Sequence, residues 1–240
     1  MEVWAIDDGT KTEYHSGILV GPDDRLEEAD MDLWEAVKGR KSIRHFTGDP
    51  VPDSDITRII ETAGLAPSGG NQQMWRFIAV CNKELRQKLR QAVCDKVDEM
   101  LEWPEVGEYA ARLKSVKGYG TYFADAPVAI AVLTEPYKNP VDRILLPAHG
   151  LTYEQVHKLR GDPATQSVGA AIQTLCLAAY ALGYGTVWMC GQNYAGAELE
   201  KLLPVPDGWR LCAMLALGVP AEDPAPRPRL PVSEILTIIH

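Results

Sequence analysis

The chain has 240 residues, and its 24 lysines and arginines against 33 aspartates and glutamates give a formal net charge of −9. This length suits one generous domain or two small ones. Nucleic acid is excluded as a main partner because an acidic chain without a basic stripe repels phosphate, and no apolar run reaches the ~18 residues of a membrane span. The acidic start is unlike a signal peptide, so we expect a cytoplasmic protein.

The acidity is concentrated in residues 1–30, which hold nine acids and two bases, a net charge of 2 − 9 = −7. The remaining residues therefore carry −9 − (−7) = −2. We predict an acidic N-terminal extension over 1–30, packed across a partner subunit, and a main domain over 31–240.

The first half of the main domain predicts helices over 30–39, 53–64 and 84–101 and a strand over 76–80. Asp53 or Ser54 is expected to cap the second helix. Glycines and aromatic residues interrupt 102–123, which predicts short helices or a mobile cover. The side chains expected to face the core from the first two helices are Leu33, Trp34, Val37, Ile56, Ile59, Ile60 and Ala63.

The second half begins with an apolar run over 127–133, which predicts a buried strand. Residues 135–164 show little periodicity and form a long excursion of the kind that is usually functional or flexible. The helix expected over 167–182 has no charged residue, so we expect it to be buried on most sides, with a place at a subunit interface. Strands are predicted over 186–189 and 210–217. Helices outnumber strands and do not alternate regularly with them, which favours the α+β class.

The cysteines are odd in number, widely spaced and without a C-x-x-C pair, so neither a disulfide framework nor a zinc site is indicated. No other ligand cluster predicts a metal. The residues expected as small, reduced core side chains are Cys81, Cys94, Cys176, Cys190 and Cys212.

Three short motifs could bind a ligand. Arg40-Lys41-Ser42-Ile43-Arg44 groups three cations and a hydroxyl, which suits an anion, although a solvated basic turn is the alternative. The turn Ala66-Pro67-Ser68-Gly69-Gly70-Asn71-Gln72-Gln73-Met74-Trp75 offers backbone N–H groups and amides to a planar heterocycle, or is an ordinary loop. Arg227-Pro228-Arg229 could close on the same anion, or is a solvated tail.

From Asp32 to the end, the order and spacing of these motifs resemble the flavin-dependent nitroreductase family. The resemblance extends through Gly169-Ala170-Ala171-Ile172-Gln173, Ala181-Leu182-Gly183-Tyr184-Gly185-Thr186 and Leu217-Gly218-Val219-Pro220. It leaves out the extension and the excursion over 135–164. Two positions depart from the family: Met74 stands where proline is common, and Cys190 where some members carry glutamate.

The resemblance implies an α+β fold with a mixed central sheet wrapped by helices, and an intertwined homodimer with one FMN at each of two interface sites. The residues implied at the FMN phosphate, ribityl chain and pyrimidine edge are Arg40, Lys41, Ser42 and Arg44, with Arg229 and Arg227 closing on the phosphate. The residues implied to reach the flavin from the other subunit are Pro67, Ser68, Gly69 and Asn71. Those implied to lie against the isoalloxazine, with a backbone N–H for N5, are Trp188, Met189, Cys190 and Gly191.

The resemblance also implies an FMN-dependent oxidoreductase that uses NAD(P)H to reduce an electron-poor small molecule, a nitroaromatic, a quinone or similar, by a ping-pong mechanism. Because the flavin carries the chemistry, no catalytic side chain is expected beyond Lys41 or Arg44 as electrostatic stabilisers of the reduced flavin. Alternatives within the family are a reductive dehalogenase of halogenated phenols or tyrosines, a flavin destructase, and an oxidase of a peptide-derived ring. For the dehalogenase, Glu105 and Tyr109 would be clamp residues, but Gly120 stands where the clamp lysine would align. A non-catalytic FMN-storage or sensor protein is the alternative of another class.

Overall fold

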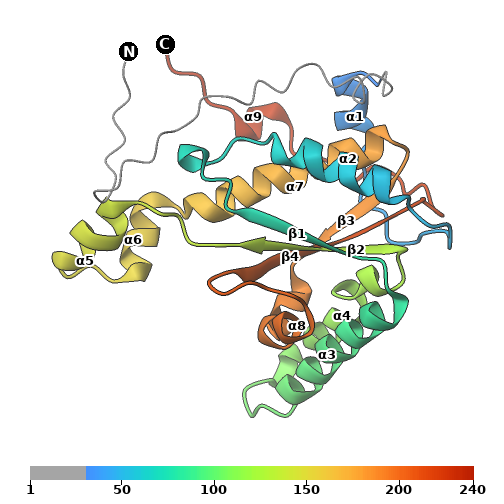
Figure 1. Cartoon of the computed structure of the whole chain (residues 1–240), viewed down its shortest axis with the longest axis horizontal. Helices are drawn as coiled ribbons and strands as arrows, with labels where there is room; N and C mark the ends of the chain where they lie inside the picture. The colour runs from blue at the N-terminus through green and yellow to red at the C-terminus, as the bar shows by residue number, and fades with distance from the viewer. Residues whose placement is uncertain (1–30) are drawn as a thin grey trace. The chain divides into compact units, whose positions relative to one another are not determined.

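A four-stranded antiparallel sheet organises residues 31–240, the part of the chain that the computed structural model describes (Figure 1). The strands are β1 (Trp75–Val80), β2 (Val128–Thr134), β3 (Gly185–Met189) and β4 (Arg210–Gly218), in the order β1-β2-β4-β3. Trp75 pairs with Thr134, Val128 with Leu217 and Gly185 with Gly218. The α+β class is confirmed. The parallel component of the expected mixed sheet is limited, within these residues, to an isolated bridge between Ser42 and Thr186.

Helices cover both faces of this sheet, as Figure 1 shows: α2 and α7 on one side, and α3, α4 and α8 on the other. Two separate clusters of buried side chains fill the two layers. The central strand β2 is buried along its whole length. Double coverage explains why β2 is a continuous apolar run instead of alternating apolar and polar residues.

The first layer consists of α2 (Asp53–Gly64) and α7 (Pro163–Ala181). Asp162 caps α7, because its carboxylate accepts a hydrogen bond from the Thr165 N–H at 3.2 Å, and Pro163 follows in the first turn. The helix therefore starts earlier than residue 167. The cap predicted for α2 is wrong: Pro52 occupies the N-cap, and no side chain caps that end.

The second layer consists of α3 (Lys83–Leu101), α4 (Ala110–Tyr119) and α8 (Gly196–Leu202). The Asn82 side chain caps α3 by accepting from the Leu85 N–H at 2.8 Å. Short 3-10 turns, η3 (Gly107–Tyr109) and η4 (Tyr122–Ala124), flank α4, so the short helices expected over 102–123 are confirmed. The helix α8 is not among the elements predicted from the sequence.

The excursion after β2 is more regular than expected. It contains a π-helical turn, η5 (Val141–Leu145), followed by α5 (Leu146–Ala148) and α6 (Tyr153–Arg160). Each of these pieces is too short for a hydrophobic period to stand out in the sequence. Figure 1 places them beyond the N-terminal end of α7.

The helix α1 (Leu33–Gly39) is confirmed, but the predicted burial of its apolar side chains is wrong. Leu33, Trp34 and Val37 are 62%, 66% and 48% exposed, and Ala36 is the buried residue. The helix has only seven residues, and these three side chains keep about half or more of their surface exposed. Two cysteines also differ from the prediction, because Cys81 and Cys190 are exposed instead of lying in the core.

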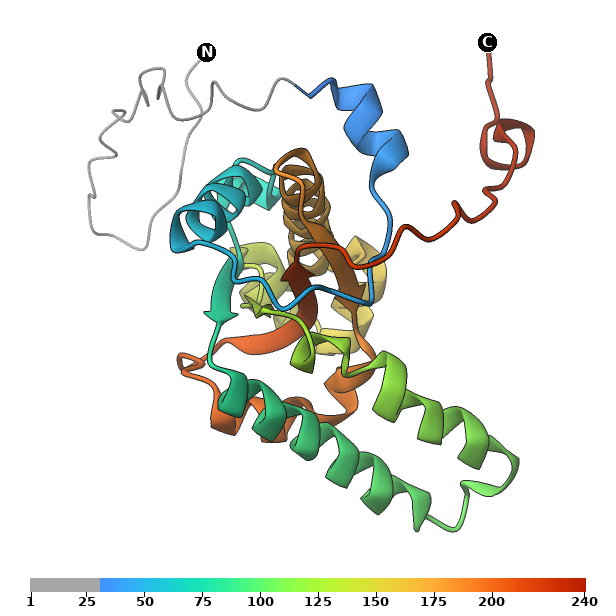
Figure 2. The same cartoon turned by 90° about the vertical axis from the view of Figure 1, so that its right-hand side faces the viewer.

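The chain beyond β4 leaves the sheet and ends with the short helix α9 (Val232–Ile235), which Figure 2 shows standing apart from both helical layers. Met31–His240 form one compact unit, and the predicted extension over 1–30 lies outside the described residues. Within the described residues, we find no helix with the length and apolar character needed to cross a membrane.

Candidate functional site

Two segments far apart in the sequence lie side by side at the edge of the sheet. One is residues 42–47; the other is the strap, which we define as residues 219–229, directly after β4. Phe46 and Pro220 form an antiparallel bridge, the Thr47 N–H donates to the Val219 carbonyl at 2.9 Å, and the Ala221 N–H donates to the His45 carbonyl at 3.0 Å. This pairing brings the first and the third motif together.

Glu222 anchors the strap. Its Oε1 atom accepts hydrogen bonds from the backbone N–H groups of Arg44, at 2.6 Å, and His45, at 3.2 Å. These bonds favour the ionised carboxylate and hold the pKa of Glu222 below its ordinary value. The carboxylate therefore stabilises the position of the strap against residues 44–45.

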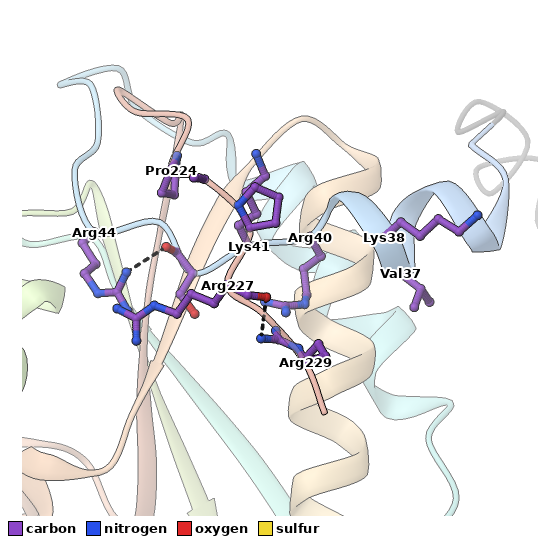
Figure 3. A pocket seen from close by; sticks show the side chains of 11 residues that line it. Val37, Lys38, Arg40, Lys41, Arg44, Pro224, Arg227 and Arg229 are labelled. Carbon is purple, nitrogen blue, oxygen red and sulfur yellow. Dashed lines mark hydrogen bonds between the residues drawn. The ribbon is translucent and has the colours of Figure 1, made fainter. Parts of the chain in front are cut away.

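The strap and residues 37–44, which run from the end of α1 into the first of these segments, line a cavity of about 450 Å³, which we call the cation cavity (Figure 3). Six cationic side chains and no acidic one line it. The lining residues are Val37, Lys38, Arg40, Lys41, Ser42, Arg44, Pro224, Ala225, Pro226, Arg227 and Arg229. The structure thus brings together all six residues of the first and third motifs that were predicted to bind a phosphate-bearing ligand.

Few of these cations are neutralised. Lys41 forms an ion pair with Asp223, which does not itself line the cavity. Arg44 Nη1 donates to the Ser42 carbonyl at 3.2 Å and Arg229 Nη1 donates to the Arg227 carbonyl at 3.3 Å, both drawn as dashed lines in Figure 3. A carbonyl oxygen carries no net charge, so these bonds do not neutralise the guanidinium groups, and the cavity is suited to a multiply charged anion.

The turn of the second motif does not line the cation cavity. Ser68 Oγ accepts from the Gln73 N–H at 3.0 Å, and the Gly69 N–H donates to Ser167 Oγ at 3.1 Å, which ties the turn to α7. Gly70 and Asn71 both have positive φ angles, 57° and 53°. Within one chain, the turn and the cation cavity are therefore separate sites.

The segment Trp188–Gly191 at the end of β3 also does not line the cation cavity. Met189 is buried, whereas Trp188 is 44% exposed. Gln192 Nε2 donates to the Met189 carbonyl at 3.0 Å and Asn193 Nδ2 donates to the Cys212 carbonyl at 2.6 Å, so two amide side chains hold this segment against the sheet.

Several residues of the site lie outside the predicted motifs. Lys38 lines the cation cavity from the last turn of α1. Its position in the sequence, two residues before Arg40, indicates that it belongs to the same cationic group. The acidic pair Glu222 and Asp223 carries no motif that would mark it as an anchor. The described residues contain no cluster of three or more histidine, cysteine, aspartate or glutamate side chains that could hold a metal ion.

Comparison with known proteins gives the family. The family model described as "Nitroreductase family" matches residues 37–219. A protein of Methanothermobacter thermautotrophicus named "Putative NADH dehydrogenase/NAD(P)H nitroreductase" is 29% identical over 218 residues, which cover 90% of this chain and 91% of that protein.

Two solved structures are similar in fold. A BluB-like flavoprotein from Clostridium difficile is 37% identical, with a TM-score of 0.80 over 88% of this chain and 100% of that one. A nitroreductase with bound FMN from Desulfitobacterium hafniense is 25% identical, with a TM-score of 0.63 over 86% of this chain and 97% of that one. The family match spans both the sheet and the first two motifs, and this chain belongs to the nitroreductase family.

Proposed function

We propose that this chain is an FMN-dependent oxidoreductase that uses NAD(P)H to reduce an electron-poor small molecule, such as a nitroaromatic or a quinone. The observation that carries the proposal is the cation cavity, where six cations from both ends of the chain meet without an acid in the lining. The named similarity to an FMN-bound nitroreductase and to a protein named as an NAD(P)H nitroreductase supports the same cofactor and donor.

The donor set of the cation cavity fits the phosphate end of FMN. A phosphate monoester carries up to two negative charges at neutral pH, and planar guanidinium groups bind it with paired charge-assisted hydrogen bonds. Arg40, Arg227 and Arg229 have no acidic partner among the described residues and would hold the phosphate. Ser42 adds a neutral hydroxyl donor.

Lys41 and Arg44 would have a different task from the phosphate-binding arginines. Preorganised cations stabilise negative charge that develops on a bound group. The Asp223 carboxylate holds Lys41 by an ion pair, and Arg44 lies 5.9 Å from the centre of the Tyr122 ring, which orients its guanidinium. We assign these two side chains to the polar edge of the cofactor.

FMN, when bound, supplies the hydride-transfer and electron-transfer chemistry, and the protein supplies binding, orientation and electrostatics. Trp188, Met189, Cys190 and Gly191 would support the cofactor at the end of β3. The turn of the second motif does not line the cation cavity of its own chain. We therefore propose that this turn contacts the FMN bound by the partner subunit, through Pro67, Ser68, Gly69 and Asn71.

The proposal includes a homodimer. The exposed apolar face of α1 and the exposed tail after residue 229, with Ile239 at 90% exposure, are unusual for a chain that remains alone in water. A second copy of the chain would bury both surfaces through a symmetric interface.

The test is anaerobic reduction of the FMN-loaded protein by NADH and by NADPH, followed in the visible flavin absorbance. We expect one of the two donors to bleach the flavin within the turnover time and a nitroaromatic or quinone to restore the colour. A yellow protein that neither donor reduces would favour storage over catalysis. A protein that stays colourless after FMN addition would contradict both functions.

Reductive dehalogenation is a second candidate, favoured by one specific observation. Glu105, Tyr109 and Arg112 line one cavity of about 270 Å³ between α3 and α4, together with further aromatic side chains. A carboxylate, a phenol and a guanidinium could bind the two charged groups of a halogenated tyrosine. Release of halide from a halotyrosine by the FMN-loaded protein, with NAD(P)H or dithionite supplying the two electrons that each halide release consumes, and its loss in Glu105→Gln, would establish this activity.

A further inference from the structure

The segment Trp188–Gly191, against which the proposed function places FMN, is held in place where β3 ends. The chain continues from it into a 3-10 turn, η6 (Gly191–Ala195). Two amide side chains of this turn, those of Gln192 and Asn193, donate hydrogen bonds to carbonyls of β3 and β4 and tie the turn to the sheet. A second support comes from α4, which contacts η6.

The end of α4 touches the segment at Gly191. A Cβ atom built on Gly191 would lie 2.6 Å from Cε2 and 3.2 Å from Cδ2 of the Tyr119 ring, and 3.5 Å from Cα of Gly120. Carbon atoms in favourable contact are about 3.5–4.0 Å apart. Glycine is therefore the residue that fits at position 191 while the Tyr119 ring keeps its place.

Gly120, which directly follows α4, makes the reciprocal contact. A Cβ atom there would lie 3.2 Å from the Gln192 backbone nitrogen and 2.7 Å from the Val116 carbonyl oxygen. Both are main-chain atoms, so no side-chain rotation relieves the overlap. Gly120 is buried and has an ordinary φ of −84°, so space and not backbone conformation requires glycine at this position.

The end of α4 is itself fixed to the second helical layer. The Gly120 N–H donates to the Val116 carbonyl at 2.8 Å, and the Thr121 hydroxyl donates to the Lys117 carbonyl at 2.5 Å. Lys117 also forms an ion pair with Asp98 of α3. The end of α4 is therefore a fixed support for the end of β3.

We propose that Tyr119 and Gly120 are positioning residues for the flavin: their contacts with Gly191 and Gln192 determine how the segment Trp188–Gly191 lies against bound FMN. This role rests on the proposed function. It adds α4, which contributes no lining residue to the cation cavity, to the elements that determine cofactor binding.

The test uses four substitutions that make the same chemical change at different places. Gly191→Ala and Gly120→Ala place a methyl group in the contact, whereas Gly118→Ala within α4 and Gly196→Ala at the start of α8 place it in open space. We expect the first two to weaken FMN binding by about tenfold or more, because overpacking displaces the segment, and to shift the visible absorbance bands of the bound flavin. The two controls should match the unmodified protein in both measurements.

Variants of Tyr119 separate positioning from folding. Its side chain is 44% exposed, so Tyr119→Ala should fold and should weaken FMN binding, whereas Tyr119→Phe keeps the ring and should bind FMN as the unmodified protein does. In Gly191→Ala/Tyr119→Ala the new methyl group has room, so the loss of affinity should be smaller than the product of the two single losses. A loss of affinity that only follows a loss of stability in urea, with unchanged flavin bands, would overturn the positioning role.

The remaining outcomes distinguish this role from the proposed function. An unmodified protein that binds no FMN contradicts the proposed function, and the positioning role with it. If the unmodified protein binds FMN and Gly191→Ala, Gly120→Ala and Tyr119→Ala all keep its affinity and absorbance bands, the positioning role alone is wrong. A loss in Gly118→Ala as large as that in Gly120→Ala would also overturn it.

Discussion

Glu222 shows how one side chain positions a functional segment. Its carboxylate accepts two backbone N–H donors that belong to Arg44 and His45, so it links the end of the chain to the first motif. The folded protein holds the pKa of Glu222 below the ordinary value, chiefly through the Arg44 N–H bond. A lowered pKa means that the stabilisation is present above the ordinary carboxyl pKa and disappears as the pH falls through the lowered pKa.

We therefore expect Glu222→Gln to unfold at a lower urea concentration than the unmodified protein at pH 7. The difference between the two midpoints should shrink as the pH falls through the lowered pKa, because the unmodified carboxylate is then protonated too. Urea unfolding followed by tryptophan fluorescence from pH 7 to pH 3 measures this. A midpoint difference that stays constant over the whole range would contradict the role of the charge.

At the residue scale, the sequence predicts the cationic side chains of the site. It does not predict the side chain that holds the strap against them, which is Glu222. Arg40, Arg44 and Arg229 stand in short motifs whose chemistry is local, and the structure brings them to one cavity. Glu222 acts on backbone groups far away in the sequence, and nothing local marks such a contact. The prediction that Trp34 is buried is wrong, because helical periodicity identifies an apolar face but does not show whether other parts of the same chain cover that face.

At the scale of elements, α7 is the central support of the site. It packs against α2 and the sheet, and Leu175 at its middle is completely buried. Gly69 of the turn donates its N–H to the Ser167 hydroxyl in the first part of this helix, and Gly169 lies near Trp188. The helix therefore connects the turn of the second motif to the end of β3.

Leu175→Ala should lower the free energy of unfolding by about 2–5 kcal/mol, because it removes buried methyl groups and leaves a cavity between α7 and the sheet. Lys88→Ala on the exposed side of α3 is the control and should change it by no more than about 0.5 kcal/mol. Urea unfolding of both variants checks the prediction. A loss below about 1 kcal/mol for Leu175→Ala would show that α7 is not a rigid support.

Long elements with a clear period could be predicted from the sequence, namely α2, α3, α7 and the four strands. The short elements α5, α6 and α8 could not, since tertiary contacts and not local pattern decide such pieces. The excursion is an example. Its irregular sequence was expected to be functional or flexible, and the structure gives it short helices that the sequence could not indicate.

At the scale of the whole molecule, the unpartnered apolar surfaces argue for assembly. Trp34 on α1 and Ile235 on α9 are 66% and 67% exposed. An interface built from such residues is sensitive to a single buried charge. The predicted extension over 1–30 would add to this interface, but it lies outside the described residues.

We expect a mass of twice 26.4 kDa in size-exclusion chromatography with light scattering. Trp34→Glu and Ile235→Glu should each shift the protein toward the monomer, because a carboxylate would be desolvated at the interface. Lys88→Glu makes a charge change at a remote surface and should leave the mass unchanged. A monomeric unmodified protein at all concentrations would contradict the dimer.

The net charge of −9 does not reveal the local cluster of cations on which the proposed function depends. An acidic protein repels anions on average, yet this chain collects six cations from its two ends around one cavity. The central claim is that these cations bind the phosphate of FMN. Riboflavin, which has the same ring system without the phosphate, is the matched ligand for testing it.

The most direct measurement is therefore the dissociation constant of FMN and of riboflavin, from quenching of flavin fluorescence, for the unmodified protein and for Arg40→Ala, Arg229→Ala and the control Lys88→Ala. The account predicts that FMN binds more tightly than riboflavin, and that each arginine variant loses about tenfold to a hundredfold in FMN affinity while its riboflavin affinity stays the same. Lys88→Ala should retain both affinities. Equal affinities for the two flavins, or FMN binding that neither arginine variant weakens, would contradict the central claim.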